Sequence, residues 1–454
     1  MARPEPFDPA VFKAYDIRGT VPDQLHPSLC RAIGAAFATI ADSPTVVLAR
    51  DMRPSGVELS AAFAEGVTSQ GVDVLDVGLA STDLLYYASG HLGAAGAMFT
   101  ASHNPAQYNG IKLCLSGARP FGEDTGLREL LALVEAGGPA GGGGAAGRVT
   151  HRDMIDAYAD HVRSFIDVSR VRPLRVVADT ANGMGGLVAP AVLNALPIEL
   201  ELMYGELDGT FPNHPADPIQ PENIKDLQAR VLETGADVGL AFDGDADRVF
   251  LVDEKGEGLS GSTTTSLLAA VLLDRNPGAS VIYNLICSKA VPEVITEHGG
   301  VPVRARVGHS FIKEVMAETG AVFGGEHSAH YYFRDNFRAD SGLVATVLLL
   351  ELLSAASEPL SELRKPVERY AASGEINTRV PDAAATVEKV AAAFGSLDQD
   401  RLDGLTVDAG SWWFNLRPSN TEPLLRLNLE APTPAECQAR VDEVLALFDP
   451  SPEA

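Results

Sequence analysis

A serine stands at the end of an apolar run, where a nucleophile carried on a loop is expected. Residues 94–99 read Ala-Ala-Gly-Ala-Met-Phe, which is typical of a buried strand, and Thr-Ala-Ser-His-Asn-Pro follows at 100–105. The proline ends the strand, because a residue that precedes proline is disfavoured in the helical region. The sequence therefore predicts that Ser102 lies in a loop at the carboxyl end of a strand, where open α/β sheets bind their ligands.

Two other roles for Ser102 have to be weighed. A serine in a loop is most often a turn residue. The neighbouring His103 would fit a Ser-His hydrolase, but adjacent residues in an extended loop point to opposite sides, and no Gly-x-Ser-x-Gly elbow surrounds the serine. A hydrolase is therefore not the preferred interpretation.

Three aspartates at alternate positions, Asp243, Asp245 and Asp247, follow the apolar run 238–242. On an extended or turning segment, carboxylates with this spacing can face one cation, and oxygen ligands favour Mg²⁺ or Ca²⁺ over zinc. A calcium-binding EF-hand loop does not fit, because Arg248 stands where its turn needs glycine and 249–252 continues as an apolar strand. A plain acidic turn remains the alternative, although three charges so close repel one another without a counter-ion.

Two later loops carry groups suited to hydroxyls and to phosphate. Residues 321–330 end an apolar strand with Glu326 and Ser328, which suit vicinal hydroxyls, whereas the histidines nearby lack further ligands for zinc. Residues 417–423 read Arg-Pro-Ser-Asn-Thr-Glu-Pro, a good set of donors for a phosphate. The glycine-rich stretch 180–186 lacks the spacing of a nucleotide-binding fingerprint, and we interpret it as a structural turn.

These four loops, with Tyr-Asn-Gly-Ile-Lys at 108–112, resemble the motifs of the α-D-phosphohexomutases, in their phosphomannomutase/phosphoglucomutase branch. In that family the serine is phosphorylated and donates its phosphoryl group to a sugar phosphate. The resemblance implies that the catalytic residues are Ser102, Arg18, Lys112, Arg248 and His309. It implies that the substrate is bound by Tyr15, Lys289, Glu326, Ser328, His330, Arg417, Ser419, Asn420 and Thr421, and that Mg²⁺ is bound by Ser102, Asp243, Asp245 and Asp247.

The resemblance also implies an activity. We expect mannose 6-phosphate and mannose 1-phosphate to be interconverted, and the glucose phosphates as well, through a hexose 1,6-bisphosphate that also acts as activator. Lys112 or His309 would be the general acid/base, and the sequence does not decide between them. Ala329 stands where the family usually has glycine. The family's sugar-binding roles are therefore transferred to Glu326 and Ser328 more safely than to His330.

Three alternative functions remain at this point. A phosphoglucosamine mutase shares the fold and the phosphoserine, but its sugar loop typically reads Gly-Glu-Gln-Ser, whereas His327 stands here. A Mg²⁺-dependent sugar phosphatase or a non-catalytic sugar-phosphate binder would use the same ligands. Neither of the last two needs both a phosphorylatable serine and a separate phosphate clamp.

Composition limits the partners. The formal net charge of −26 argues against nucleic acid or an anionic membrane, so the cations that bind a phosphosugar must converge on one cleft. The four cysteines are far apart and read as reduced thiols, which predicts a cytoplasmic protein. The start lacks an apolar signal core, and the apolar run 343–353 is too short to span a bilayer. We expect a monomer or a weak homodimer.

The elements that must position these loops alternate along the chain. Helices are predicted at 28–40, 56–69, 127–135, 152–165, 262–273, 291–298, 383–394 and 434–448, and strands at 45–49, 72–77, 94–99, 174–179, 237–242, 280–285, 301–307, 405–409, 411–416 and 424–429. This order predicts three similar mixed-sheet α/β domains followed by a smaller α+β domain, all around one central cleft. The predicted limits are 1–147, 148–250, 251–365 and 366–454, with the first boundary in a glycine-rich segment at 137–147.

Overall fold

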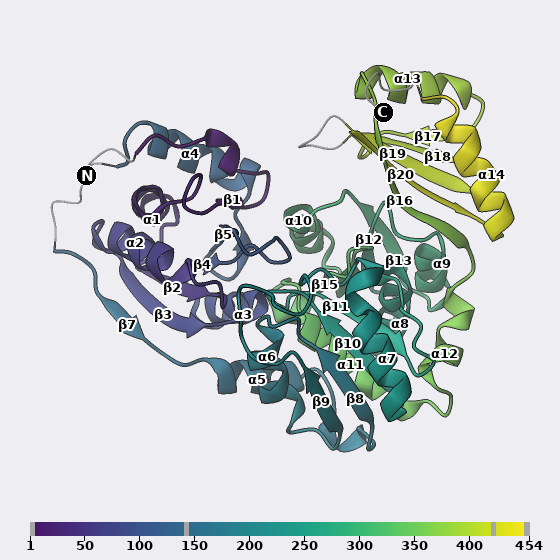
Figure 1. The fold of residues 1–454 in the computed structure, drawn as a ribbon, viewed down its shortest axis with the longest axis horizontal. Coiled ribbons are helices and arrows are strands. Elements are labelled where there is room, and N and C mark those ends of the chain that lie inside the picture. Colours follow the sequence, from purple (N-terminus) through teal and green to yellow (C-terminus); the bar gives the residue numbers. More distant parts are fainter. Residues whose placement is uncertain (1–4, 140–144, 419–423, 449–454) are drawn as a thin grey trace.

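The computed structural model describes residues 5–139, 145–418 and 424–448, which form four sheets in chain order (Figure 1). The first sheet has the order β1-β5-β4-β2-β3-β7, with β6 paired to β5. Its strands are β1 (Ile17–Thr20), β2 (Thr45–Arg50), β3 (Asp73–Leu79), β4 (Ala95–Phe99), β5 (Tyr108–Leu115), β6 (Arg119–Pro120) and β7 (Val149–His151). It is packed with α1 (Pro27–Ile40), α2 (Gly56–Thr68), α3 (Thr82–Leu92) and α4 (Leu127–Glu135).

The second sheet, of order β11-β10-β8-β9, carries the aspartate loop. Strands β8, β9 and β10 are parallel, and β11 closes the edge as an antiparallel strand. Phe242 pairs with Val249, so residues 243–248 form the turn between β10 and β11. The elements are α5 (Ile155–Arg163), β8 (Arg175–Asp179), α6 (Gly185–Leu193), β9 (Glu199–Met203), α7 (Lys225–Thr234), β10 (Val238–Phe242) and β11 (Val249–Asp253).

The third sheet repeats this plan with the order β13-β12-β14-β15, in which the last strand is again antiparallel. Its strands are β12 (Ser280–Asn284), β13 (Val301–Ala305), β14 (Phe323–Gly325) and β15 (Tyr331–Phe333). The helices are α8 (Gly261–Arg275), α9 (Ala290–Glu297), α10 (His309–Thr319), α11 (Gly342–Ala355) and α12 (Leu360–Leu363). The last long one, α11, also packs against α5 and β11, so it joins the second and third sheets.

The fourth sheet is antiparallel throughout, in the order β16-β20-β19-β18-β17. Its elements are β16 (Ala371–Arg379), α13 (Ala383–Ala393), β17 (Asp398–Asp400), β18 (Leu405–Asp408), β19 (Trp413–Pro418), β20 (Leu424–Ala431) and α14 (Pro434–Leu445). The predicted fold class, three mixed α/β domains and a smaller α+β domain, is confirmed. The sequence patterns did not predict the helices α3, α7, α10 and α12 or the strands β5, β6, β7, β9, β15, β16 and β17.

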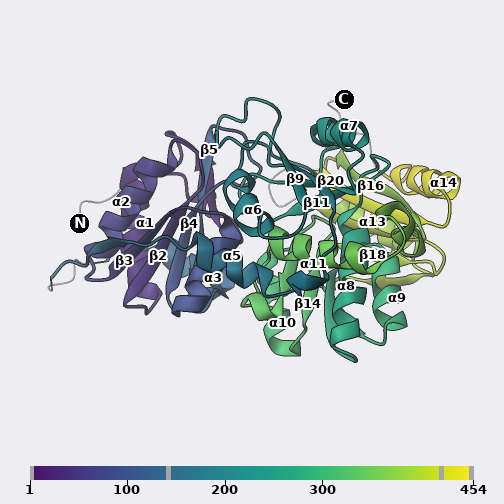
Figure 2. The same cartoon turned by 90° about the horizontal axis from the view of Figure 1, so that it is seen from below.

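The buried apolar side chains separate the fourth sheet from the first three. One continuous cluster of buried side chains runs from Val47 to Leu360 and joins the first three sheets, whereas the fourth sheet has its own cluster between Val380 and Val444. Figure 1 accordingly shows the C-terminal strands and helices as a separate lobe, and Figure 2 shows this lobe and the first sheet at opposite ends of the molecule.

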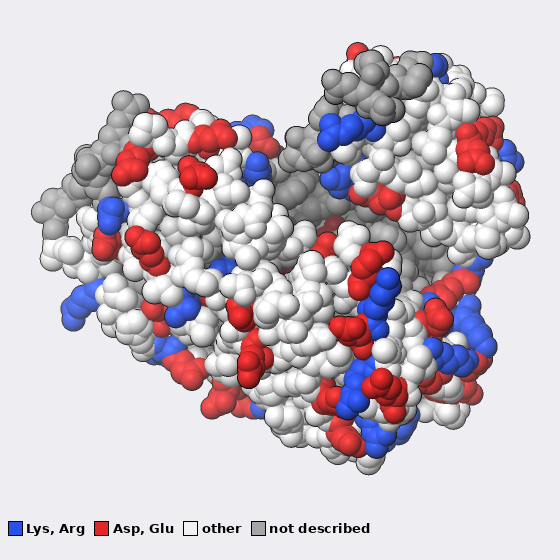
Figure 3. All heavy atoms as spheres, viewed as in Figure 1, with Lys and Arg blue, Asp and Glu red and all other residues white. Residues whose placement is uncertain are grey.

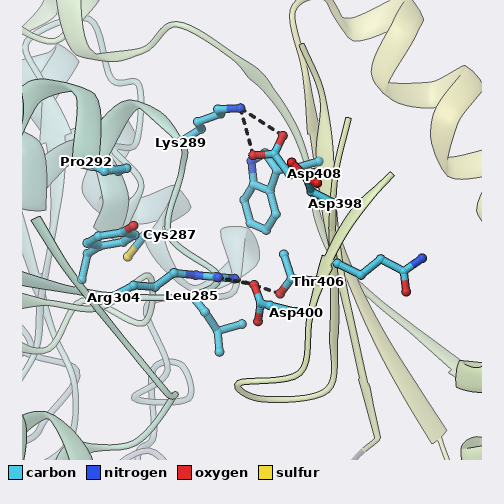
Figure 4. Close-up of a pocket in the computed structure, with 12 residues that line it drawn as sticks. Leu285, Cys287, Lys289, Pro292, Arg304, Asp398, Asp400, Thr406 and Asp408 are labelled. Carbon is cyan, nitrogen blue, oxygen red and sulfur yellow. Dashed lines mark hydrogen bonds and ion pairs between the residues drawn. The ribbon is translucent and has the colours of Figure 1, made fainter. Parts of the chain in front are cut away.

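The seam between the third and fourth sheets is polar and partly hollow. Lys289 Nζ lies 3.1 Å from Asp408 Oδ1, and Arg304 donates to Thr406 Oγ1 at 2.9 Å and pairs with Asp400. These residues line a cavity of about 280 Å³ between the two lobes (Figure 4). Ion pairs rather than a shared core therefore connect the C-terminal lobe to the third sheet.

Among the described residues, no single helix is long and apolar enough to cross a membrane. Helix α11 with residues 360–367 passes the length and composition test only as a pair bent by 95°. Helix α11 is almost entirely buried in the protein, as expected for its apolar sequence.

A buried carboxyl group ties three elements of the first three domains together. Asp83, in the first turn of α3, accepts hydrogen bonds from the hydroxyls of Ser81, Tyr158 and Ser341, of which the last caps α11. Asp83 is fully buried, and this burial raises its pKa to about 6 in spite of the three donors.

The raised pKa of Asp83 predicts a pH-dependent stability. A carboxyl group whose pKa is raised on folding stabilises the protein on acidification, because the folded state then binds the proton more tightly. Between about pH 7.5 and about pH 5 this group should contribute about 1.4 kcal/mol. Asp83→Asn keeps an acceptor but cannot titrate, so the Tm of the wild type should rise relative to that of the variant on going to the lower pH. A constant difference in Tm across this range would contradict the assignment.

Candidate active site

Ser102 lies in the loop directly after β4, as the sequence predicts. Its φ of +48° is in the left-handed region, its amide donates to Thr100 Oγ1 at 2.9 Å, and the residue is 4% exposed. Its Oγ donates to Asp243 Oδ2 at 2.7 Å, so the hydroxyl is aimed across a domain boundary at the aspartate turn.

The prediction that Ser102 and His103 point to opposite sides is wrong. His103 Nδ1 lies 3.2 Å from Ser102 Oγ, because the left-handed conformation of the serine turns the chain and brings both side chains to one side. Arg248 donates to the same Nδ1 at 2.7 Å, and burial together with this guanidinium lowers the pKa of His103 well below its usual value. His103 is therefore a neutral imidazole in contact with the serine.

The three aspartates of the β10–β11 turn form a compact group of oxygen ligands. Asp243, Asp245 and Asp247 are buried, and one carboxylate oxygen of each lies within 4.8 Å of one in the other two. Asp245 Oδ1 and Asp247 Oδ1 are buried without a hydrogen-bond partner in the described part of the chain. Two orphaned carboxylate oxygens beside the serine hydroxyl fit a hard divalent cation such as Mg²⁺.

The two cations around this turn act on different aspartates. Arg248 Nε donates to Asp243 Oδ2 at 3.0 Å, yet burial and the neighbouring carboxylates still raise the pKa of Asp243. Lys112 Nζ lies 2.8 Å from Asp245 Oδ2 and 2.6 Å from Asp247 Oδ2. Although burial opposes it, Lys112 holds the pKa of Asp245 below its usual value, and the two carboxylates keep the pKa of Lys112 well above its own.

Strand pairing explains how Lys112 and Arg18 reach this point. Lys112 on β5 is opposite Met98 on β4, and Arg18 on β1 is opposite Gly110 on β5, so both side chains start beside the end of β4. Arg18 donates to Asn104 Oδ1 at 2.6 Å and pairs with Asp16. The structure therefore brings Arg18, Lys112 and Arg248 together around the serine loop and the aspartate turn.

The third domain contributes the loop after β14. Glu326 is 2% exposed and accepts from Tyr332 Oη at 2.6 Å, Asn284 Nδ2 at 3.0 Å and the Gly308 amide at 3.2 Å. This loop meets the aspartate turn, because His330 forms an isolated β-bridge with Arg248.

His330 connects the same loop to an aspartate. Its Nδ1 lies 3.1 Å from Ser328 Oγ, and its Nε2 lies 3.7 Å from Asp247 Oδ1. Ala329, where the family usually has glycine, adopts a φ of +64°, which costs a residue with a Cβ about 1–2 kcal/mol. The alanine thus keeps the glycine-like turn of the loop at the expense of strain.

Two further predicted residues, Tyr15 and Arg417, belong to the first and fourth domains and interact electrostatically. Tyr15 donates to the carbonyl of Val307 at 3.2 Å and packs edge-on against Phe311 of the third domain. Arg417, the last residue but one of β19, pairs with Glu375, and its positive charge acts to lower the pKa of Tyr15, which burial raises overall. Figure 3 shows Lys and Arg side chains on the part of the C-terminal lobe that borders the hollow between the lobes.

The remaining predicted residues divide into two groups. The structure does not bring Lys289 to this site, since its ammonium binds Asp408 and the Gly410 carbonyl at the seam between the third and fourth domains. Ser419, Asn420 and Thr421 lie outside the described residues, and so does the side chain of His309, whose backbone begins α10.

Sequence reasoning also missed a contact of the first domain with the aspartate turn. Thr82, at the start of α3, donates from its amide to the Asp245 carbonyl at 3.0 Å and from its hydroxyl to Asp245 Oδ2 at 2.6 Å. The available signal was Ser-Thr-Asp at 81–83 after an apolar strand, a typical helix start that says nothing of the distant partner.

Comparisons with known proteins cover the whole of this arrangement. Models described as phosphoglucomutase/phosphomannomutase, alpha/beta/alpha domains I, II and III, match residues 9–138, 156–257 and 260–370, and the model of the C-terminal domain matches residues 375–447. A phosphomannomutase of Salmonella montevideo is 42% identical over 449 residues, 96% of this chain and 98% of that protein. A protein of Xanthomonas campestris named phosphohexose mutases is 43% identical over 423 residues, 92% of this chain and 94% of its own.

Solved structures agree with the fold. A phosphoglucomutase/phosphomannomutase family protein from Burkholderia thailandensis superimposes with a TM-score of 0.89 at 32% identity, covering 97% of this chain and 98% of its own. N-acetylphosphoglucosamine mutase of Aspergillus fumigatus, solved with GlcNAc-6P and magnesium, has a TM-score of 0.63 at 13% identity, with 98% and 96% covered. The second likeness concerns the fold alone.

The two hydrogen bonds of Thr82 yield a prediction about the aspartate turn. Thr82→Val keeps the shape of the side chain but removes a donor from a buried carboxylate, which should lower stability by about 1.5–3 kcal/mol. Mg²⁺ should then bind more weakly, because the Oδ2 of Asp245 is left with the Lys112 ammonium alone and is held less firmly. Thermal unfolding and titration calorimetry with Mg²⁺ would measure both effects, and Thr39→Val, which removes a hydroxyl that donates to a carbonyl within α1, is the control. An unchanged Mg²⁺ affinity would contradict this role.

Proposed function

The chain belongs to the phosphoglucomutase/phosphomannomutase family of the α-D-phosphohexomutases, and on that basis we propose that it interconverts mannose 6-phosphate and mannose 1-phosphate, together with the glucose phosphates. The observation that carries the proposal is the hydrogen bond from Ser102 Oγ to Asp243, which places a serine hydroxyl beside three buried carboxylates, Lys112 and Arg248. This is the set of groups that phosphoryl transfer needs, because the reaction depends on positioning and charge neutralisation.

In the proposed reaction the phosphorylated Ser102 donates its phosphoryl group to the free hydroxyl of a hexose phosphate. The P–O bond to the serine breaks and a P–O bond to the sugar forms. The sugar hydroxyl loses its proton to a general base, and the serine oxygen takes up a proton from a general acid to become a hydroxyl again. The resulting 1,6-bisphosphate turns over in the cleft and returns its other phosphoryl group to Ser102. The product therefore differs from the substrate only in the position of its phosphate.

Ser102, Asp243, Asp245 and Asp247 would hold Mg²⁺, which when bound supplies positive charge against the transferring phosphoryl group. Arg248 is fixed between Asp243 and His103, so its guanidinium lies beside the serine that would carry the phosphoryl group. Arg18 is held by Asn104, two residues beyond the serine, and adds a second guanidinium.

The sugar and its second phosphate would be bound by the other two domains. Glu326 and Ser328 would accept and donate hydrogen bonds to sugar hydroxyls, with His330 and Tyr15 beside them. Arg417 begins the loop that carries Ser419, Asn420 and Thr421, which would bind the phosphate that is not reacting. Two separated phosphate sites allow the bisphosphate to bind in either orientation.

The general acid/base remains a choice between two residues. Lys112 is held as an ammonium by Asp245 and Asp247, and an ammonium can donate a proton but cannot accept one. Because its pKa is raised, this ammonium is also a weak acid, so we favour His309 as the general acid/base, with Lys112 as the alternative. We further propose that the phosphosugar is the only partner required, that a hexose 1,6-bisphosphate activates the protein by phosphorylating Ser102, and that it is a monomer or weak homodimer.

A direct assay would test the proposed activity. The protein is incubated with Mg²⁺, a trace of glucose 1,6-bisphosphate, and mannose 1-phosphate, glucose 1-phosphate or glucosamine 1-phosphate, and the products are followed by phosphorus NMR. We expect the first two sugars to become 6-phosphates without free phosphate. Conversion of the glucosamine compound alone would indicate a phosphoglucosamine mutase, and net release of phosphate would indicate a phosphatase.

Ser102 is the residue on which the mechanism depends most. Ser102→Ala removes the oxygen that carries the phosphoryl group, so turnover should fall by a factor on the order of 10³ or more. Intact-protein mass spectrometry should at the same time show no phosphorylation after incubation with glucose 1,6-bisphosphate. Near-normal turnover in this variant would exclude a phosphoserine mechanism. Ser116→Ala is the matched control, because that hydroxyl only donates to the Gly93 carbonyl of the same domain.

A further inference from the structure

We propose that Arg53 is a positioning residue that holds Ser102 in its left-handed conformation and so aims the serine hydroxyl at Asp243. The inference deepens the proposed function and rests on it, because it concerns the geometry of the phosphorylated serine. Arg53 lies about fifty residues before the serine in the chain, between β2 and α2, and it belongs to none of the four site loops.

The guanidinium of Arg53 binds the backbone of the whole serine loop. Its two terminal nitrogens donate four hydrogen bonds to main-chain carbonyls, at 2.6–2.9 Å. The acceptors are the carbonyls of Ser102, Asn104, Pro105 and Tyr108. One side chain therefore gathers the carbonyls of the loop from the serine to the start of β5.

These contacts act on the conformation of Ser102 and not on its hydroxyl. The φ of +48° costs a residue with a Cβ about 1–2 kcal/mol, so surrounding contacts must maintain it. Arg53 Nη2 donates to the Ser102 carbonyl at 2.9 Å, and Gly244 approaches the same oxygen so closely that a Cβ there would lie 2.4 Å from it. The carbonyl is thus fixed between the guanidinium and the aspartate turn, which leaves Oγ directed at Asp243.

Arg53 is itself fixed from several sides. It is 1% exposed, and Asp51 accepts from its amide at 2.9 Å and from Nε at 3.2 Å. The ring of Phe211 from the second domain covers the guanidinium at 5.0 Å, and Gly209 lies against its Cα. Asp51 thus binds the Nε of this buried guanidinium, and Phe211 covers its face. The remaining N–H donors are therefore directed at the serine loop.

Lysine cannot replace this arrangement, because one ammonium carries three donors and no planar fork. Arg53→Lys should therefore leave the loop in several conformations and lower kcat by about 10²-fold, as expected for a misplaced reacting group, with KM changed by less than about 3-fold. The phosphorus NMR signal of the phosphorylated serine should broaden or split in the variant. Equal losses in kcat and in sugar-phosphate affinity, with a single unchanged phosphoserine signal, would overturn the proposal.

Arg364→Lys is the matched control. Arg364 in the third domain is likewise largely buried, pairs with Asp253 at 2.8 Å and donates to the Gly258 carbonyl at 2.9 Å. It contacts none of the four site loops in the described residues. This variant should lower Tm without changing kcat or the phosphoserine signal.

A double-mutant cycle tests the conformational argument without any activity. Alanine at position 102 keeps the cost of a positive φ, whereas glycine adopts it freely. Arg53→Lys should therefore lower Tm by less in the Ser102→Ala protein than in the Ser102→Gly protein, because only the alanine loop recovers the cost of the positive φ when it is released. Equal losses of Tm in the two backgrounds would show that Arg53 does not maintain the φ of Ser102. Because this cycle needs no turnover, its result stands even where the wild-type protein proves to have no mutase activity.

Discussion

The arrangement of the domains depends on the burial of three like charges in one turn. Asp243, Asp245 and Asp247 are at most 1% exposed, and carboxylates so placed are stable only with opposite charges and hydrogen-bond donors around them. Arg248 comes from the same turn, but Lys112, Thr82 and the Ser102 hydroxyl come from the first domain. The second domain cannot satisfy its own aspartates, so the site exists only where the first two domains meet.

The C-terminal lobe is attached by a different kind of contact. One apolar cluster spans the first three domains, although the first and third domains also have clusters of their own. The fourth domain has a separate cluster and meets the third through Lys289–Asp408, Arg304–Asp400 and a cavity between them. A polar seam opposes relative movement less than a shared core does, because its groups can exchange their partners for water. Arg417 therefore lies on the domain that is least restrained, which under the proposed function would suit an intermediate that has to turn over between the two transfers.

Prediction from the sequence succeeded where a single segment carries the information. The apolar runs before Ser102, Asp243 and Glu326 fix three strands, and each loop follows from where its strand ends. Prediction failed where the answer depends on a backbone angle or on a second domain. His103 lies on the same side of the chain as the Ser102 side chain because Ser102 has a positive φ. A serine at position 102 gives no indication of such a φ. The role of Thr82 and the remote place of Lys289 follow from partners more than a hundred residues away.

The charges of the site explain why an acidic protein can act on a phosphorylated sugar. With Lys112 and Arg248 set against the three aspartates, the formal charges leave one negative charge in excess, and the Oδ1 atoms of Asp245 and Asp247 have no hydrogen-bond partner among the described residues. A phosphoryl group on Ser102 would add about two more negative charges, which two lysine or arginine side chains already committed to carboxylates cannot balance. The site therefore needs a divalent cation and a further guanidinium at the moment when its serine is phosphorylated. Arg18 is held by Asn104 in the serine loop and by Asp16, so it would have to leave Asp16 to be that guanidinium.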